Sequence, residues 1–275
     1  MADVSSAASD AAGTVRDAAQ SEPAKVAVRV GILAYGVTHV LIAWLALQLA
    51  FGGSGQSTDQ AGAFQTLAQG TVGRILLWVL AVGFVAVVFW RAGEAVAGFS
   101  YQPDSKKQLA SRVGSGAKAV VFASLTVLAV RTALGGSSGG GGQQAAAGVL
   151  GWPGGQWIVG IAGLVVVVVG VVTAVRGWKK SFTDDMVLPA DKRARETAVR
   201  SGQIGTIAKG AVTALVGVLV VVAAVRFKPE EANGLDAALK TLAAQPYGSV
   251  LLVVAALGLA SFGVFCAFDA RYHRV

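Results

Sequence analysis

A histidine within a long uncharged stretch is the most chemically versatile side chain that this sequence places among apolar residues. His39 lies eight residues after Gly31, about 12 Å along a helix axis. An ionisable group near the middle of a membrane-spanning segment commonly marks a pathway for ions, protons or substrates, and imidazole titrates between about pH 5 and 8. Tyr35 lies one turn earlier, and Thr213 takes the place of His39 in a later copy of the same segment. We predict a candidate intramembrane polar site formed by His39, Tyr35 and Thr213.

The alternative interpretation of His39 is structural. A neutral imidazole that hydrogen-bonds to Tyr35 or to a neighbouring helix needs no further chemistry to explain it. No second histidine, cysteine or acid lies at a comparable depth, so the sequence predicts no metal site and no cofactor. Ser-His-Asp sets, paired carboxylates and GxSxG motifs are also lacking, which argues against an enzyme.

Two acidic residues form the centre of a second candidate site. Glu94 follows Gly73 at the same spacing as Asp269 follows Gly248, and each acid stands at the end of an apolar segment. A carboxylate at a helix C-terminus opposes the helix dipole and therefore needs a cationic partner. Basic residues at the same level make this either a ring of ion pairs or a site for an anionic lipid headgroup. The predicted set is Glu94, Asp269, Lys118, Lys209, Arg29 and Arg271.

Six uncharged apolar segments are the elements that position these side chains. The chain has 54% hydrophobic and only 14% charged residues, with a mean hydropathy of +0.62, whereas soluble domains carry about 25% charged residues. About 20 residues of helix cross a bilayer, and the shorter segments reach this length when flanking lysines and arginines extend their charged groups to the lipid headgroups. We therefore predict an all-α integral membrane protein with six transmembrane helices, in segments 30–51, 75–90, 119–130, 157–175, 210–225 and 250–268.

The distribution of basic residues predicts the orientation. Most of the 23 lysines and arginines lie in the N-terminal tail, in loops 91–118 and 176–209, and at the C-terminus. By the positive-inside rule, both termini are expected to be cytoplasmic in the inner (plasma) membrane. Residues 1–28 are expected to form a flexible cytoplasmic tail and lack the pattern of a signal peptide. The net charge of +8 reflects this topology and not nucleic-acid binding, because no soluble basic domain or aromatic platform accompanies it.

Three copies of one pattern divide the chain into units of two helices. The start of the first helix recurs as GILAYG, GSGAKA and GTIAKG, so Tyr35, Lys118 and Lys209 occupy equivalent positions. The segment before the second helix recurs as TLAQGTVG and TLAAQPYG, with GWPGGQWIVG as a weaker middle copy. Units of one orientation are related by an axis along the membrane normal. We predict three repeated hairpins in a pseudo-threefold arrangement, from units 29–100, 101–181 and 182–275, the last including a cytoplasmic loop.

These repeated motifs carry a resemblance to a known family. The GxxA[YK][GA] starts, the TLAxxxxG segments and the close DARYHRV at 269–275 resemble the bacterial domain-of-unknown-function family 1206. The resemblance runs from about residue 25 to the end of the chain. It implies a membrane protein of six helices in three two-helix repeats, and it implies no activity. The middle unit departs from the pattern most, because GGSSGGGGQQAAAG replaces an ordinary connecting loop.

The expected function is non-enzymatic. We predict a structural, lipid-binding or accessory protein whose partners are membrane lipids or another membrane protein, with no nucleic acid among them. The alternative is a small transporter or channel that uses His39 within the bundle. A transporter needs a polar route through the helices, whereas a structural protein needs a packed interior.

Overall fold

Six long helices dominate the part of the chain that the structure, a computed structural model, describes, namely residues 22–53, 57–97, 105–136, 148–226 and 234–273. Each of them is long and apolar enough to cross a membrane, as the sequence predicts. Even the 24 residues of the shortest extend about 36 Å, more than the roughly 30 Å of bilayer hydrocarbon. The helices are α2 (Glu22–Ala50), α4 (Thr71–Ala97), α5 (Ser105–Ala133), α7 (Gly155–Trp178), α8 (Lys192–Arg226) and α10 (Gly248–Tyr272).

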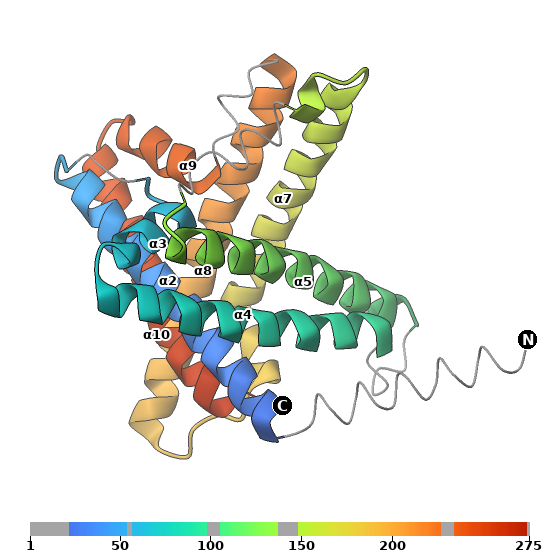
Figure 1. The fold of residues 1–275 in the computed structure, drawn as a ribbon, viewed down its shortest axis with the longest axis vertical. Helices are drawn as coiled ribbons and strands as arrows, with labels where there is room; N and C mark the ends of the chain where they lie inside the picture. Colours follow the sequence, from blue (N-terminus) through green and yellow to red (C-terminus); the bar gives the residue numbers. More distant parts are fainter. Residues whose placement is uncertain (1–21, 54–56, 98–104, 137–147, 227–233, 274–275) are drawn as a thin grey trace, which may run out of the picture.

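The closest helix pairs join different repeat units. Helix α4 packs along α5 and α7 along α8, while α10 returns to pack along α2. Contacts of α2 with α4, and of α8 with α10, then join these pairs. Figure 1 shows the α4–α5 pair running across the upright α7–α8 pair. The expected hairpins therefore exist as sequence units, but each first helix packs most extensively against a second helix from another unit.

Glycines at equivalent positions allow two of these pairs to approach closely. A Cβ added to Gly36 on α2 would lie 3.0 Å from the carbonyl oxygen of Gly263 on α10. A Cβ added to Gly210 on α8 would lie 2.7 Å from the carbonyl oxygen of Gly170 on α7. Gly263 and Gly170 occupy the same position in their units. Small residues thus set the helix separation, as is common where van der Waals packing drives association in membranes.

The middle unit lacks the contact between its own two helices. In the first unit, a Cβ on Gly83 would lie 3.0 Å from Gly31 Cα, and in the third unit Gly258 faces Ala208. The equivalent position on α7 holds Val165, which is 55% exposed, and Gly114 on α5 has open space around it. A branched side chain at this position is incompatible with the close approach seen in the other two units.

Two short helices cover one end of the bundle. They are α3 (Gln60–Ala68) and α9 (Gly234–Ala243), and each inserts a large, fully buried side chain, Phe64 and Leu239 respectively, into the main apolar core. The carboxylate of Asp236 on α9 accepts a hydrogen bond from the backbone N–H of Thr58, just before α3, at 2.7 Å. This bond connects the third unit to the first.

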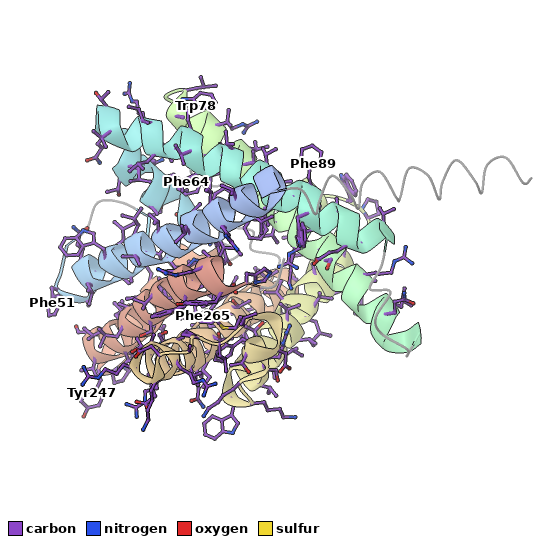
Figure 2. All side chains as sticks on the ribbon, turned by 90° about the horizontal axis from the view of Figure 1, so that it is seen from below. Phe51, Phe64, Trp78, Phe89, Tyr247 and Phe265 are labelled. Carbon is purple, nitrogen blue, oxygen red and sulfur yellow. The ribbon has the colours of Figure 1, made fainter. Side chains whose placement is uncertain are left out.

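Side-chain exposure divides the helices into an inner and an outer surface. Figure 2 shows Trp78 and Phe89 projecting away from the helices, whereas Phe64 and Phe265 lie between them. Phe89 is 72% exposed and Phe265 only 6%. Large exposed apolar side chains along the six helices are the expected covering of a bundle that faces lipid acyl chains.

Candidate functional site

A partly open cavity of about 240 Å³ lies among α2, α8 and α10, and α3 and α9 contribute to its wall. It brings together all three residues of the predicted intramembrane polar site. It also contains Lys209, which the sequence placed in the second candidate site. The polar side chains that line it are Tyr35, His39, Gln60, Lys209 and Thr213, and the apolar ones are Val212, Val216, Leu235 and Leu259.

His39 is buried, with 4% of its surface exposed, and its orientation is fixed by one hydrogen bond. Its Nδ1 lies 2.8 Å from the backbone carbonyl oxygen of Tyr35. A carbonyl only accepts hydrogen bonds, so Nδ1 carries the hydrogen and donates it. In the neutral ring, Nε2 is then an acceptor, and no described residue donates to it. The imidazole packs edge-on against Tyr35 and Phe262, with ring centroids 4.4 and 4.8 Å away.

Lys209 lies against the same two aromatic rings. Its Nζ is 4.3 Å from the ring centroid of Phe262 and 4.8 Å from that of Tyr35. Within the described part of the chain, no carboxylate forms an ion pair with it. Two cation–π contacts stabilise a desolvated ammonium by about 2 kcal/mol, much less than a full charge loses on leaving water. The site is therefore a positively charged recess with aromatic walls.

A glycine one turn before Lys209 explains how the ammonium reaches Phe262. Helical side chains lean toward the N-terminus of their helix, so the Lys209 side chain extends back toward Gly205. Gly205 packs directly on Phe262, and an added Cβ would lie 2.8 Å from Phe262 Cβ. The close approach of α8 and α10 at Gly205 thus brings the ring under the ammonium.

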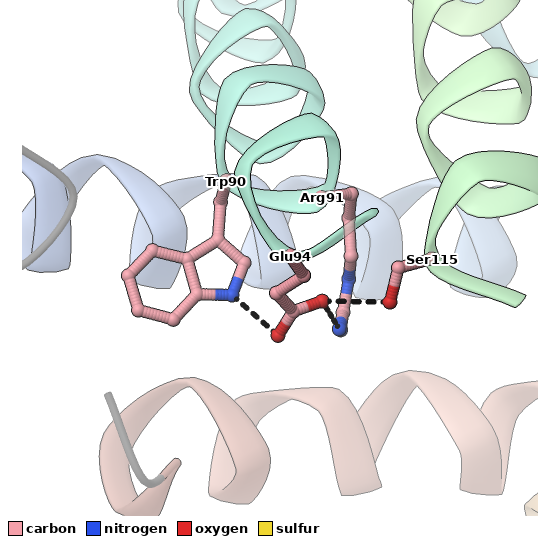
Figure 3. A network of polar contacts seen from close by, with 4 residues as sticks. All are labelled: Trp90, Arg91, Glu94 and Ser115. Carbon is pink, nitrogen blue, oxygen red and sulfur yellow. Dashed lines mark hydrogen bonds and ion pairs between the residues drawn. The ribbon is translucent and has the colours of Figure 1, made fainter. Parts of the chain in front are cut away.

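Glu94 belongs to a separate polar network that fastens α4 to α5. Its Oε1 accepts from Trp90 Nε1 at 3.0 Å, and its Oε2 accepts from Arg91 at 2.7 Å and from Ser115 Oγ at 2.9 Å (Figure 3). On α5, Arg112 donates to the carbonyl oxygens of residues 95 and 96 at the end of α4, at 2.8 and 2.7 Å. These polar groups hold α4 and α5 together, and both carboxylate oxygens of Glu94 accept hydrogen bonds.

Asp269, the repeat equivalent of Glu94, lies in a third network. Its Oδ1 is 2.8 Å from His273 Nδ1. His273 also forms a β-bridge with Met186, and the N–H of Val187 donates to the carbonyl of Tyr272 at 2.8 Å. These bonds attach the segment after α7, which includes the short helix Ser181–Asp185, to the end of α10.

The remaining residues of the second candidate site lie apart from the cavity lining. Arg271 stacks over the Tyr272 ring at 5.7 Å, and Arg29 is exposed on α2. Lys118, the repeat equivalent of Lys209, is exposed on α5 and does not line the cavity. Glu94 and Asp269 are bonded within different networks. A ring of ion pairs that links them stays a prediction.

Phe262 is an aromatic site residue that the sequence did not single out. It lies in an apolar run on α10 and has no polar group of its own. The repeat did carry a signal, because the equivalent positions in the other units hold Val87 and Val169. An aromatic ring that replaces valine in one unit only is a departure from the repeat. Tyr35 is a second departure, because the equivalent positions in the other two units hold Lys118 and Lys209.

Comparisons with known proteins agree with the repeat architecture. The chain is 29% identical over 249 residues to a protein of Bacillus subtilis (strain 168) named Uncharacterized protein YxxB, and the match covers 90% of each chain. No solved structure matches. The family described as Domain of Unknown Function (DUF1206) matches three times, over residues 30–98, 113–180 and 204–273. Each match covers most of the two long helices of one unit, which confirms three repeated segments, and the chain therefore belongs to the DUF1206 family.

Proposed function

We propose that this protein is a non-enzymatic, multi-pass protein of the inner (plasma) membrane that binds an anionic lipid in the cavity beside Lys209. One observation carries the proposal: the Lys209 ammonium lies against Phe262 and Tyr35, with no acid paired to it among the described residues. A charge within a bilayer is costly unless it is paired or reaches water. The phosphate of an anionic headgroup would supply the missing charge and accept hydrogen bonds from the ammonium.

The size and lining of the cavity support a headgroup as the occupant. Sites that enclose a whole drug-sized ligand have volumes of about 300 to 1,000 Å³, so a cavity of about 240 Å³ holds only part of a lipid. Tyr35, His39 and Thr213 contribute polar groups to the cavity lining that would meet the headgroup. Val212 and Val216 contribute an apolar part of the same lining. The acyl chains would then leave along the apolar helices.

The finer arrangement that we propose is a pseudo-threefold ring of helix pairs that is open at one place. The pairs α2–α10, α4–α5 and α7–α8 are equivalent in the repeat, and the contacts α2–α4 and α8–α10 are equivalent to each other. Their counterpart between α5 and α7 is the missing contact, at Gly114 and Val165.

The proposed orientation places both termini and the loops after α4 and α7 in the cytoplasm. Single cysteines on a Cys266→Ser background test it in intact cells with a membrane-impermeant maleimide. We expect labelling of Gln69→Cys and Gln245→Cys, which lie at exposed positions between the helices of the first and third units. Lys106→Cys and Lys192→Cys should be labelled only after the cells are permeabilised. Labelling of either cysteine, at position 106 or 192, in intact cells would contradict the proposed orientation.

Lipid binding is tested by removing one charge. Purified wild-type protein, incubated in detergent with phosphatidylglycerol and phosphatidylcholine and analysed by native mass spectrometry, should retain the anionic lipid with about a tenfold preference. A hydrogen bond to a charged group contributes about 1.5 to 3 kcal/mol, and 1.4 kcal/mol is tenfold in affinity. Lys209→Gln should remove this preference because it removes the ammonium and keeps a side chain of similar length.

Lys118→Gln is the matched control, because it removes the equivalent lysine of the middle unit, which lies outside the cavity lining. It should bind phosphatidylglycerol as the wild type does. An equal loss in both variants would assign the preference to overall charge and contradict the proposed site.

The alternative function, a small transporter or channel, is favoured by the free acceptor on His39 beside a cation in the same cavity. Proton flux into liposomes that contain the wild-type protein, lost in both His39→Gln and His39→Leu, would replace the lipid-binding proposal.

A further inference from the structure

We infer that the lipid recognised here is an anionic phosphodiester whose headgroup carries a hydroxyl, with Lys209 binding the phosphate and His39 Nε2 accepting a hydrogen bond from the hydroxyl. This inference rests on the proposed function and adds the chemical identity of the headgroup. Three features of the cavity support it.

The first feature is the acceptor. The hydrogen bond from Nδ1 to the Tyr35 carbonyl uses the only N–H of the neutral imidazole. Nε2 therefore presents a lone pair, and a ligand group that meets it must donate a hydrogen bond. A phosphodiester oxygen cannot do so, because it carries no hydrogen at neutral pH. A hydroxyl can.

The second feature is that the cation and the acceptor share one recess. The Lys209 ammonium and the His39 ring both lie on the rings of Tyr35 and Phe262. One ligand can therefore contact both groups only if its anionic oxygen and its donor are a few bonds apart. A polyol esterified to phosphate, such as glycerol, has this spacing.

The third feature is the hydroxyl of Thr213, one turn after Lys209 on the same helix. Thr38, Thr126 and Thr173 each donate their hydroxyl to a backbone carbonyl four residues earlier, at 3.0, 2.9 and 2.7 Å. Thr213 makes no such bond and lines the cavity. Its hydroxyl is available to donate to a second phosphate oxygen or to accept from a polyol.

Charge excludes the commonest zwitterionic headgroups. Choline and ethanolamine carry a cation a few bonds from the phosphate, and this cation would approach the Lys209 ammonium in a recess without an acid among its described lining residues. Like charges in a medium of low dielectric repel strongly. The class that remains is a polyol phosphodiester lipid with a net negative charge.

Two lipids of equal charge and identical acyl chains separate the role of the hydroxyl from that of the phosphate. Phosphatidylglycerol has a headgroup hydroxyl, and phosphatidylmethanol has the same phosphodiester without one. In competition for the full-length protein in detergent, measured by native mass spectrometry, the wild type should prefer phosphatidylglycerol about five-fold, the effect of one hydrogen bond. His39→Leu should bind the two equally and still prefer both to phosphatidylcholine. His39→Gln retains an acceptor oxygen and should keep part of the preference.

The outcomes distinguish this inference from the proposed function. A wild type that does not prefer either anionic lipid to phosphatidylcholine overturns the proposed function. Equal binding of phosphatidylglycerol and phosphatidylmethanol by the wild type overturns the hydroxyl inference alone, even if His39→Leu does not fold. Displacement of bound phosphatidylglycerol by an equimolar amount of soluble glycerol 3-phosphate would overturn a lipid as the source of the headgroup.

Discussion

Replacing Gly210 with leucine is expected to disrupt the α7–α8 pair and to reduce the stability of the purified protein more than any surface change on the same helix. The Cβ alone would lie 2.7 Å from the Gly170 carbonyl oxygen and 2.8 Å from Ala174 Cα. Both contacts are with backbone, which moves only if the helices separate. Overpacking of this kind costs about 3 kcal/mol. The measurement is the fraction of monodisperse protein left after heating in detergent, followed by fluorescence-detected size-exclusion chromatography.

A matched leucine on the same helix provides the control. Val218 is 46% exposed on α8, so Val218→Leu adds apolar volume where lipid or detergent accommodates it. We expect almost no change in thermal stability for this variant and an intermediate loss for Gly210→Ala. If Gly210→Leu and Val218→Leu lowered the stability equally, the helices would not approach each other at Gly210.

Hydropathy, charge and repeats are enough to predict the six long helices. They do not predict which helices pack against each other. The six helices follow from apolar length, and the equivalence of Gly31, Gly114 and Gly205 follows from self-alignment. Helices α2, α5 and α8 begin earlier than these glycines, at Glu22, Ser105 and Lys192. Which helices pack together depends on shape at a few positions. Val165 stands where the other units have glycine, and this one difference accompanies the missing contact between α5 and α7. A repeat pattern predicts that the three units make the same helix contacts. It cannot by itself predict which unit lacks one of those contacts.

The candidate site was predicted in part, for the same reason. The sequence predicts one polar site from His39, Tyr35 and Thr213, and the structure places these residues around one cavity. The sequence predicts Lys209 at the headgroup level, because a lysine at the edge of an apolar run commonly extends to the interface. The contact of Gly205 with Phe262 on another helix directs its ammonium against the rings of Tyr35 and Phe262 instead. A contact between helices distant in sequence leaves no local pattern to detect.

Phe262→Ala is expected to have the second large effect, because this ring supports both the core and the charged recess. Phe262 is 7% exposed and lies against Tyr35, His39 and Phe265, with ring centroids 5.9, 4.8 and 6.1 Å away. Truncating a buried phenylalanine to alanine costs about 3 to 5 kcal/mol. Val264→Ala is the control on the same helix, since Val264 is 46% exposed. Thermal stability should fall sharply in the first variant and hardly change in the second.

Phe262→Leu separates the two roles of the ring. Leucine keeps most of the apolar volume, so the stability loss should stay below about 1.5 kcal/mol. It has no π face, so Lys209 loses the closer of its two cation–π contacts, at 4.3 Å, and is held in the recess only by Tyr35. The ammonium then moves among more rotamers, and ordering it around a phosphate costs more entropy. We therefore expect Phe262→Leu to fold and to bind phosphatidylglycerol several-fold more weakly in the same mass-spectrometric assay. Unchanged lipid affinity in a folded Phe262→Leu protein would mean that the ring serves packing alone and that Lys209 is positioned by other contacts.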